Sequence, residues 1–378
     1  MSKLFEPLKI GTLEIQNRFI RSATYYALSD ENGFINDKST ELMEHLAEGN
    51  IGLIITGYAF VIKHGQVFPD MNGIDTDEHI PKYQKMTQAV HERKGKIVMQ
   101  IAHGGSISTF AANGNGDYVA VSLTDALPDY RRKPRELTDA DIHEIIEAFG
   151  QSAGRVEKSG FDGVQIHGAH GYLISEFLSP TTNQRQDKWG GNLENRMRFL
   201  IEVIRAIKKS VSEDFPVLIK LGCCDYLEGK EGLTIEEGKE VAKKIEAEGI
   251  SLIEISHGRI DKKFKKSTVN IKSTEDEAYM LEAAKAIRSS VSIPLCLVGG
   301  MRSLPVMEEI IDSGIVDSIS ISRPFIREPD FVQRFKNKEK TRVDCISCRG
   351  CMTTDEKGKN HVYCRQLEKI RAKKGHSK

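Results

Sequence analysis

The alternation of strands and helices is clearest around the stretch His167-Gly-Ala-His170-Gly-Tyr172, which continues to Trp189-Gly190-Gly191. An apolar run that ends at Ile166 precedes it and is typical of a buried strand. An amphipathic segment follows it and opens with Asn192, a residue type that often caps a helix. Two histidines and a tyrosine are therefore expected just past the C-terminal end of a strand, where βα proteins carry out their chemistry.

The same pattern recurs along the chain, with eight strand signals of which seven follow a helix signal. The helices are expected at about 38–47, 82–93, 139–158, after 192, 235–247, 275–290 and 304–312. The first strand is expected over 15–24. Short apolar strands between longer amphipathic helices predict a parallel sheet covered on its outer face. We therefore expect a (β/α)8 TIM barrel over residues 1–336, followed by a cysteine-rich C-terminal extension over 337–378.

An open, doubly wound nucleotide-binding sheet is the alternative fold. The sequence carries neither a Gly-x-Gly-x-x-Gly fingerprint after its first strand nor a phosphate loop of the Walker type, which disfavours that alternative. Two long connections, 58–80 and 104–137, follow the second and third strands. Both should leave the C-terminal end of the barrel, where long loops shape a substrate pocket or a lid.

Composition narrows the possible partners and location. Lysine plus arginine equals aspartate plus glutamate, at 54 each, so no charge imbalance points to nucleic acid or to an acidic membrane surface. We find no signal-peptide core and no apolar run long enough to cross a membrane, and we expect a cytoplasmic protein. Cys223, Cys224 and Cys296 lie beside apolar runs and are expected to be buried thiols.

Small and polar residues gather at the predicted strand ends. They are Ser22, Ala23, Thr24, Gly57, Gln100, His103, His167, His170, Tyr172, Lys220, Ser256, His257, Gly299, Gly300, Ser322 and Arg323. Glycines let backbone N–H groups approach an anion, and an arginine adds a bidentate charge, so the ends of strands seven and eight predict a phosphate site. Lys220 and Gln100 nearer the centre suit the ring of a phosphorylated heteroaromatic cofactor such as a flavin, whereas a Schiff-base lysine at Lys220 is the alternative.

Five segments carry a family resemblance. They are 17–24, the run Gln100-Ile-Ala-His103-Gly-Gly, 167–191, 297–300 and 322–324. With these segments, residues 3–335 resemble the old yellow enzyme family of FMN-dependent ene-reductases and NADH:flavin oxidoreductases. Many members of that family carry Pro-Met or Pro-Leu where this chain has Ala23-Thr24.

The resemblance also implies roles for these residues. Ala23, Gly57, Gln100 and Lys220 would hold the flavin ring of FMN, with Gly300 and Arg323 on its phosphate. His167 and His170 would bind the carbonyl oxygen of an α,β-unsaturated substrate, and Tyr172 would donate the proton that completes reduction. The segment 185–191 would be structural.

Four cysteines lie close together in the C-terminal extension. Cys345, Cys348 and Cys351 are spaced by two residues each, and Cys364 follows after twelve. Three close thiolates and one distant thiolate suit a [4Fe-4S] cluster, while a zinc site or unligated thiols remain alternatives. The spacing resembles the cluster motif that follows the barrel in trimethylamine dehydrogenase and 2,4-dienoyl-CoA reductase.

These features together predict an FMN-dependent oxidoreductase that takes hydride from NAD(P)H and reduces an activated C=C bond. An amine or enoate dehydrogenase or reductase that exchanges electrons with a redox partner protein through the cluster is the second hypothesis. The histidine pair disfavours an amine substrate, which would instead call for an aromatic cage. A flavin-carrying electron-transfer module or a metal-stabilised binding protein is the third, and a homo-oligomer is compatible with each.

Overall fold

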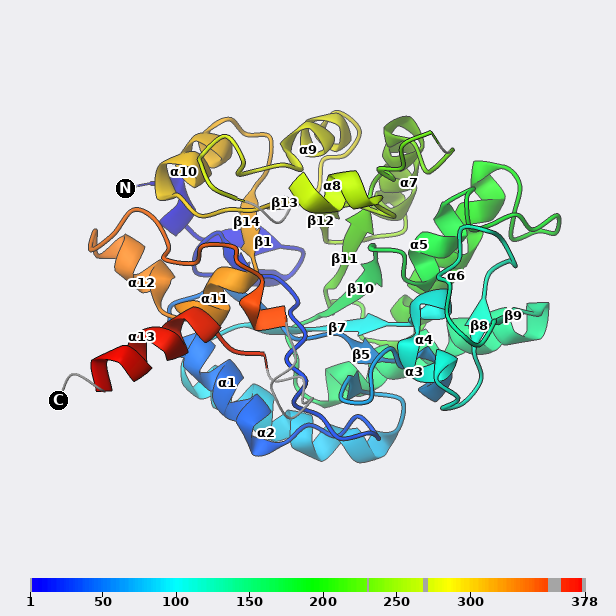
Figure 1. Cartoon of the computed structure of the whole chain (residues 1–378), viewed down its shortest axis with the longest axis horizontal. Helices are drawn as coiled ribbons and strands as arrows, with labels where there is room; N and C mark the ends of the chain where they lie inside the picture. The colour runs from blue at the N-terminus through cyan, green and yellow to red at the C-terminus, as the bar shows by residue number, and fades with distance from the viewer. Residues whose placement is uncertain (1, 230, 268–270, 353–361, 376–378) are drawn as a thin grey trace.

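The computed structural model describes residues 2–229, 231–267, 271–352 and 362–375. Its centre is a closed ring of parallel strands, formed because β10 pairs with β11 on one side and with β7 on the other. In order around the ring, the strands are β3 (Phe19–Arg21), β4 (Leu53–Ile55), β7 (Ile97–Ala102), β10 (Val164–Gly168), β11 (Val217–Gly222), β12 (Leu252–Ser256), β13 (Leu295–Val298) and β14 (Ser318–Ile321). The predicted TIM barrel is confirmed, and Figure 1 shows its strands enclosed by helices.

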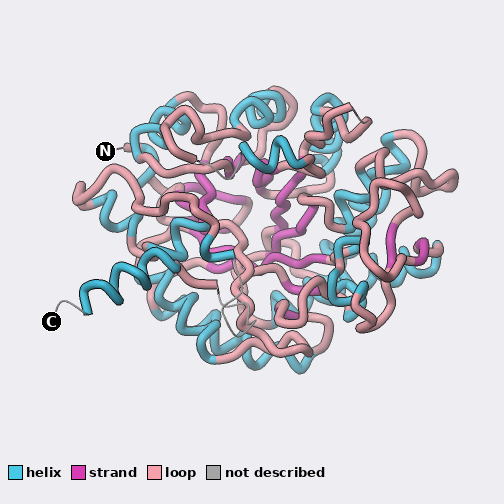
Figure 2. The backbone as a smooth tube through the Cα atoms, in the orientation of Figure 1, coloured by secondary structure: helices cyan, strands magenta, loops and turns pink. Residues whose placement is uncertain are grey.

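Several of the surrounding helices begin at residues whose side chains cap them. Thr138 caps its helix in a reciprocal arrangement with Asp141, Thr234 does the same with Glu237, and Asn192 accepts the backbone N–H of Asn195. The main outer helices are α1 (Asp37–Glu48), α2 (Ile80–Glu92), α4 (Asp139–Lys158), α6 (Leu193–Ser210), α7 (Ile235–Ala247), α9 (Leu281–Arg288) and α10 (Leu304–Asp312). Figure 2 shows these helices as the outer layer around the strands.

Two predicted boundaries are wrong. The helix expected over 275–290 begins only at Leu281, because the Asp276 carboxylate accepts the backbone N–H groups of Lys272 and Ser273, and Ala278 has a φ of +58°. The first barrel strand is also shorter than the apolar pattern from Ile15 suggests. Ile15 instead belongs to β2 (Leu13–Ile15), which pairs with β1 (Leu8–Ile10) in an antiparallel hairpin.

The hairpin completes one layer of the core. Its side chains Ile10, Leu13 and Ile15 form a single buried cluster with residues from the barrel strands, namely Ile20, Leu53, Ile55, Val98, Leu218, Leu252 and Cys296. As predicted, Cys296 is buried, and so are Cys223 and Cys224. This apolar packing fills one end of the barrel and leaves polar side chains for the other end.

The two long connections carry structure of their own. Residues 58–80 include β5 (Ala59–Phe60) and β6 (Asn72–Gly73), which extend the sheet from β7. Residues 104–137 include α3 (Thr109–Ala112) and the paired strands β8 (Val119–Ala120) and β9 (Arg135–Glu136). Arg185 donates hydrogen bonds to the carbonyl oxygens of Val121 (3.1 Å) and Leu137 (2.6 Å) in the second loop. The structural role expected for the 185–191 segment agrees with these contacts.

The chain after the barrel returns across α10. The backbone N–H of Val343 donates to the carbonyl of Arg302 (3.0 Å), and that of Leu304 donates to the carbonyl of Thr341 (2.8 Å). The chain reaches this point through α11 (Arg323–Arg327) and α12 (Phe331–Lys336), and the last described element is α13 (Arg365–Gly375). Figure 1 shows α13 at the same side of the molecule as α12. Within the described ranges, no helix is long and apolar enough to cross a membrane.

Candidate active site

A buried polar network occupies the barrel at the end opposite the hairpin. The Glu254 carboxylate accepts hydrogen bonds from the hydroxyls of Ser22 and Ser320, each at 2.7 Å, and from the Gln165 amide at 2.9 Å. Gln100 in turn donates to Gln165 at 2.6 Å. Strands that are distant in sequence are thus joined by one fully buried carboxylate.

Lys220 is the cation of this network. Its Nζ lies 3.1 Å from Glu254 Oε1 and 2.7 Å from Ser22 Oγ, and both charged side chains are buried. An ammonium group carries three donors, and these two contacts use two of them. The third can serve a ligand above the network, where Gln100 also lies. The contact with Glu254 also fits a charged lysine held by a carboxylate better than the neutral amine that Schiff-base chemistry needs.

The ends of β3, β14 and β4 meet beside the network. Thr24 Oγ1 and Ser322 Oγ form a hydrogen bond of 2.7 Å, so the first and last strands of the barrel present hydroxyls together. Ala23 is partly buried and packs against the apolar cluster that the hairpin forms with the barrel strands. At Gly57, a β-carbon would stand 2.7 Å from the Thr24 carbonyl oxygen, so this close approach of β3 and β4 requires glycine.

The predicted phosphate-binding site lies between the end of β13 and the C-terminal segment of the chain. Gly300 has a φ of +73°, and a β-carbon there would come within 2.7 Å of the Ile271 side chain. Gly299 precedes it directly after β13, and Arg323 begins α11 after β14. Burial lowers the pKa of Arg302, and the Arg323 charge lowers it further. Two guanidinium groups close together near Gly300 favour an anion at this place.

His167 and His170 extend from the end of β10 over Lys220. Burial lowers the pKa of His167 well below its usual value, and Lys220 lowers it further. His170 is exposed in the barrel mouth, yet the surrounding protein also lowers its pKa, with His257, His167 and Lys220 adding to the effect. Both rings are therefore neutral at pH 7, and each carries one N–H donor.

The geometry of the pair leaves hydrogen-bonding capacity for a ligand. The two imidazole centroids are 5.2 Å apart, and Nδ1 of His167 is buried without a hydrogen-bond partner among the described residues. His170 has a φ of +63°, which is rare for a residue with a side chain, and its Nε2 lies 2.8 Å from Ser256 Oγ. Such backbone strain occurs often at functional sites.

Tyr172 lies against the face of His167, with ring centroids 4.1 Å apart. The side chain is 7% exposed, and burial raises the pKa of its hydroxyl. The hydroxyl is therefore protonated at neutral pH. A neutral histidine pair and a protonated phenol side by side can bind an oxygen atom and supply a proton.

Several residues of the site were not predicted. Gln165, Glu254 and Ser320 complete the buried network, and Tyr58 and Tyr25 form an aromatic wall beside Tyr172. The strand residues carried a usable signal, because side chains two positions apart on a strand share one face. Gln165, Glu254 and Ser320 each stand two positions before a residue that was predicted or noted at a strand end: His167, Ser256 and Ser322.

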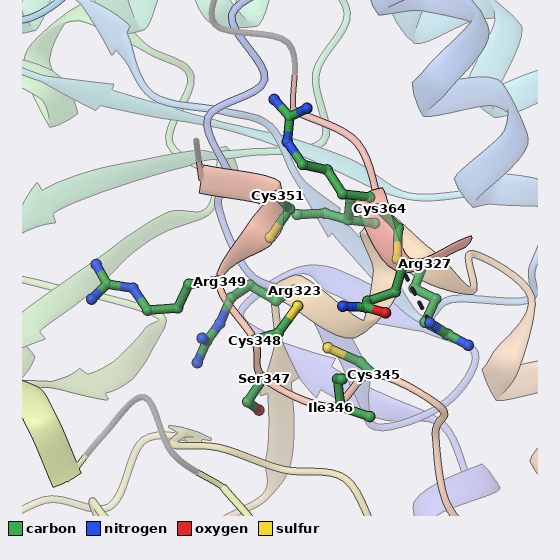
Figure 3. A pocket seen from close by; sticks show the side chains of 12 residues that line it. Arg323, Arg327, Cys345, Ile346, Ser347, Cys348, Arg349, Cys351 and Cys364 are labelled. Atoms are coloured by element: carbon green, nitrogen blue, oxygen red, sulfur yellow. Dashed lines mark hydrogen bonds between the residues drawn. The ribbon is translucent and has the colours of Figure 1, made fainter. Parts of the chain in front are cut away.

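The four clustered cysteines line one small pocket on the outside of the barrel. Arg302 donates to the Cys345 carbonyl (3.2 Å) and to Ser347 Oγ, which ties the loop to the region next to Gly300. Ser347 and Arg349 both have positive φ values, near +56° and +59°. Figure 3 shows the four cysteine side chains with Arg323 and Arg327 beside them.

The thiols do not converge on one point. Among the residues that the structure describes, no three histidine, cysteine or acidic side chains are close enough together to hold a single metal ion. Arg327 Nη1 lies 3.8 Å from Cys364 Sγ. Arg365, next to Cys364, donates to the carbonyl of Gly350, next to Cys351, at 3.0 Å, and this hydrogen bond connects the two cysteine-bearing segments. Burial raises the pKa of the Cys351 thiol, and the Arg323 charge partly opposes this.

The fold and site define a flavin-type barrel, and comparison with known proteins gives its family. A model of the "NADH:flavin oxidoreductase / NADH oxidase family" matches residues 3–342, and the chain belongs to that family. The chain is 35% identical to the NADPH dehydrogenase of Geobacillus sp. (strain WCH70) over 86% of this chain and 91% of that protein. It is 34% identical to the NADH oxidase of Thermoanaerobacter brockii over 92% of this chain and 53% of that one.

A solved structure extends the comparison. The structure of a 2-naphthoyl-CoA reductase with 2-naphthoyl-CoA superposes with a TM-score of 0.83 at 29% identity, over 93% of this chain and 54% of that one. The chain thus spans about half the length of two of these relatives. The resemblance to NADH:flavin oxidoreductases is confirmed.

Proposed function

We propose that the protein is an FMN-dependent oxidoreductase that takes hydride from NAD(P)H and reduces the activated C=C bond of α,β-unsaturated carbonyl compounds. The observation that carries this proposal is the neutral pair His167 and His170 beside protonated Tyr172, directly above the Lys220 network. The family of the chain and the two named dehydrogenase and oxidase relatives support the flavin and the nicotinamide donor.

The residues present fit FMN. Lys220 has a donor left for a ring oxygen or nitrogen, Gln100 offers an amide beside it, and Ser22, Ala23, Thr24 and Gly57 would line the ring edge. Gly299, Gly300, Ser322 and Arg323 would hold the phosphate. FMN, when bound, supplies the hydride chemistry of the reaction.

The protein side chains then act on the substrate. One N–H from each neutral imidazole would donate to the carbonyl oxygen and draw electron density from the conjugated C=C bond. Tyr172 would deliver the proton to the carbon next to the carbonyl. The depressed histidine pKa values matter here, because a carbonyl oxygen requires a donor and neutral rings donate without the desolvation cost of a buried charge.

The substitution Tyr172→Phe tests this assignment. Enone reduction should slow by about 10²- to 10⁴-fold, the usual contribution of a general acid, while reduction of the flavin by NAD(P)H continues. Rapid-mixing absorbance measurements follow the two half-reactions separately. Unchanged enone turnover in the variant would remove Tyr172 from the mechanism.

We further propose that Cys345, Cys348, Cys351 and Cys364 bind a [4Fe-4S] cluster. Four thiols line one pocket, and a [4Fe-4S] cluster takes four thiolates, each of which binds a different iron. Arg323, Arg327 and Arg365 around the pocket would balance the negative charge of such a group. An enzyme with a cluster at this site could pass electrons from its flavin to a redox partner protein.

Iron, sulfide and zinc analysis of anaerobically purified protein tests the cluster. About four irons and four sulfides per chain are expected, with loss of both in Cys348→Ser. Cys224→Ser is the matched control, because Cys224 is a buried thiol on another loop and should leave the iron content unchanged. One zinc per chain and no iron would establish the zinc alternative.

One observation favours the amine dehydrogenase hypothesis as a second candidate. Tyr25 packs against Tyr58 and Phe68, with ring centroids 5.8 Å and 5.1 Å away, and Tyr58 packs against Tyr172. An aromatic group of this kind can surround an alkylammonium ion. Bleaching of the flavin absorbance by a methylated amine, without NAD(P)H, would support this candidate, whereas bleaching by NAD(P)H and recovery with an enone supports the first.

The cytoplasmic location and a homo-oligomeric state stay predictions from the sequence.

A further inference from the structure

Tyr58 lies at the centre of the aromatic wall, and the proposed reaction gives it no role. It lies between β4 and β5, directly before β5, and its ring stands edge-on to Tyr172 with centroids 5.5 Å apart. The ring also lies 6.0 Å from His167. The two phenols are neighbours in this contact, and each affects the pKa of the other.

The surroundings hold Tyr58 in this orientation. Its ring is stacked on Tyr25 at an interplanar angle of 11°, and the Tyr25 hydroxyl donates to the Asp70 carboxylate. The preceding carbonyl, of Gly57, accepts a hydrogen bond of 3.2 Å from Asn72. A stacked ring and an anchored backbone leave the phenol few alternative positions, so its edge-on contact with Tyr172 is preorganised.

A proton donor in this place needs such a neighbour. When Tyr172 gives up its proton, a negative phenolate remains at a side chain that is 7% exposed. A buried anion without a hydrogen-bond donor is costly, which would raise the barrier to proton transfer. Burial raises the pKa of both phenols, and the neighbouring Tyr58 opposes that rise at Tyr172.

We propose that Tyr58 is a positioning residue that stabilises the Tyr172 phenolate during proton transfer and returns a proton to it afterwards. The Tyr172 O–H bond breaks as the substrate carbon–hydrogen bond forms. The Tyr58 O–H bond then breaks as the Tyr172 O–H bond forms again, and solvent water supplies the proton that restores Tyr58. No electrons move in either step, and one proton is consumed from water in each cycle.

This inference rests on the proposed reduction of enones, and the variant Tyr58→Phe tests it. Phenylalanine keeps the stacked ring and removes only the hydroxyl. The reoxidation of the reduced enzyme by an enone should slow by about 10- to 100-fold, the effect of one hydrogen bond to a charged group. Flavin reduction by NAD(P)H and the KM for the enone should change by less than about twofold, since Tyr58 is not expected to contact either molecule.

The double variant separates this role from a structural one. In a Tyr172→Phe background, Tyr58→Phe should cause no further loss, because its effect passes through the Tyr172 hydroxyl. The solvent isotope effect on reoxidation should also increase in Tyr58→Phe alone. Tyr83→Phe is the matched control, because it loses a buried hydroxyl on α2 that donates to the Gly73 carbonyl at 3.0 Å and is not part of this wall.

The outcomes are distinguishable. Full activity in Tyr58→Phe, or additive losses in the double variant, would overturn the role of Tyr58 and leave the proposed function intact. A different result would overturn the proposed function itself. In it, NAD(P)H reduces the wild-type enzyme, but enones reoxidise the wild type no faster than they reoxidise Tyr172→Phe. The role of Tyr58 would then fail as well.

Discussion

His167 on β10 is the direct register partner of Lys220 on β11. The parallel pairing places a histidine and a lysine side by side, so the positive charge of Lys220 opposes protonation of His167. The same lysine is held by Glu254 and Ser22 on the other side. One residue therefore connects the buried network to the histidine pair and keeps that pair in the form that can donate to a carbonyl.

The state of the histidine pair can be checked through ligand binding. Because the pKa values of His167 and His170 are lowered, affinity for an uncharged carbonyl ligand should stay constant as the pH falls from about 7.5 to about 6, across the usual histidine range. In Lys220→Met the pKa of His167 rises, and the affinity should begin to change at higher pH than in the wild type. Absorbance titrations of the flavin measure this, and a wild-type midpoint near the ordinary histidine value would contradict the prediction.

The substitution Glu254→Gln should be strongly destabilising. It leaves the Lys220 ammonium buried without its counter-charge, which typically costs about 3–5 kcal/mol in the free energy of unfolding. Urea denaturation with excess FMN measures the change. The control is Glu240→Gln, which removes an exposed ion pair with Lys243 and should cost less than about 0.5 kcal/mol. Equal effects of the two substitutions would show that the network contributes little to stability.

Gly300 and Gly314 form a natural pair for comparison. Both have a φ of +73°, but a β-carbon would meet Ile271 at Gly300 and nothing within 4 Å at Gly314. Each alanine substitution should therefore cost about 1–2 kcal/mol of stability from the backbone conformation alone. Only Gly300→Ala should also weaken FMN binding, measured by fluorescence titration. Equal FMN affinity in the two variants would place the phosphate elsewhere.

The buried carboxyl group of Glu176 should make the free energy of unfolding depend on pH. Burial raises its pKa from 4.5 to about 7, although hydrogen bonds from the hydroxyl and backbone of Ser106 oppose the shift. Between these values the unfolded chain releases the proton and the folded chain retains it, so the free energy of unfolding should fall as the pH rises from about 4.5 to 7.

The variant Glu176→Gln carries no titrating group at this position. Its unfolding free energy should lose this part of the pH dependence, worth up to about 3 kcal/mol at 1.36 kcal/mol per pKa unit. Chemical denaturation at several pH values compares it with the wild type. Parallel curves for the two proteins would show that Glu176 ionises normally in the folded state.

Local patterns in the sequence specified the elements. The helices α4, α7 and α10 begin and end where their apolar periodicity and capping residues predict, at Asp139–Lys158, Ile235–Ala247 and Leu304–Asp312. The strand-end residues Ser22, Gln100 and Lys220 were also identified from position alone, since residues at the carboxyl ends of parallel strands face one mouth. These features depend on neighbours within a few residues.

Only the tertiary structure decided which side chains touch. Glu254 and Ser320 carried only a faint period-two signal, because their importance comes from partners on other strands, as in the contacts with Ser22 and Gln165. Tyr58 became significant because the fold places its ring edge-on against that of Tyr172, 114 positions later in the sequence. The sequence by itself thus determined the barrel and the residues at its mouth, whereas closure of the ring decided their hydrogen bonds, charges and protonation states, since these depend on distances between segments that local patterns do not contain.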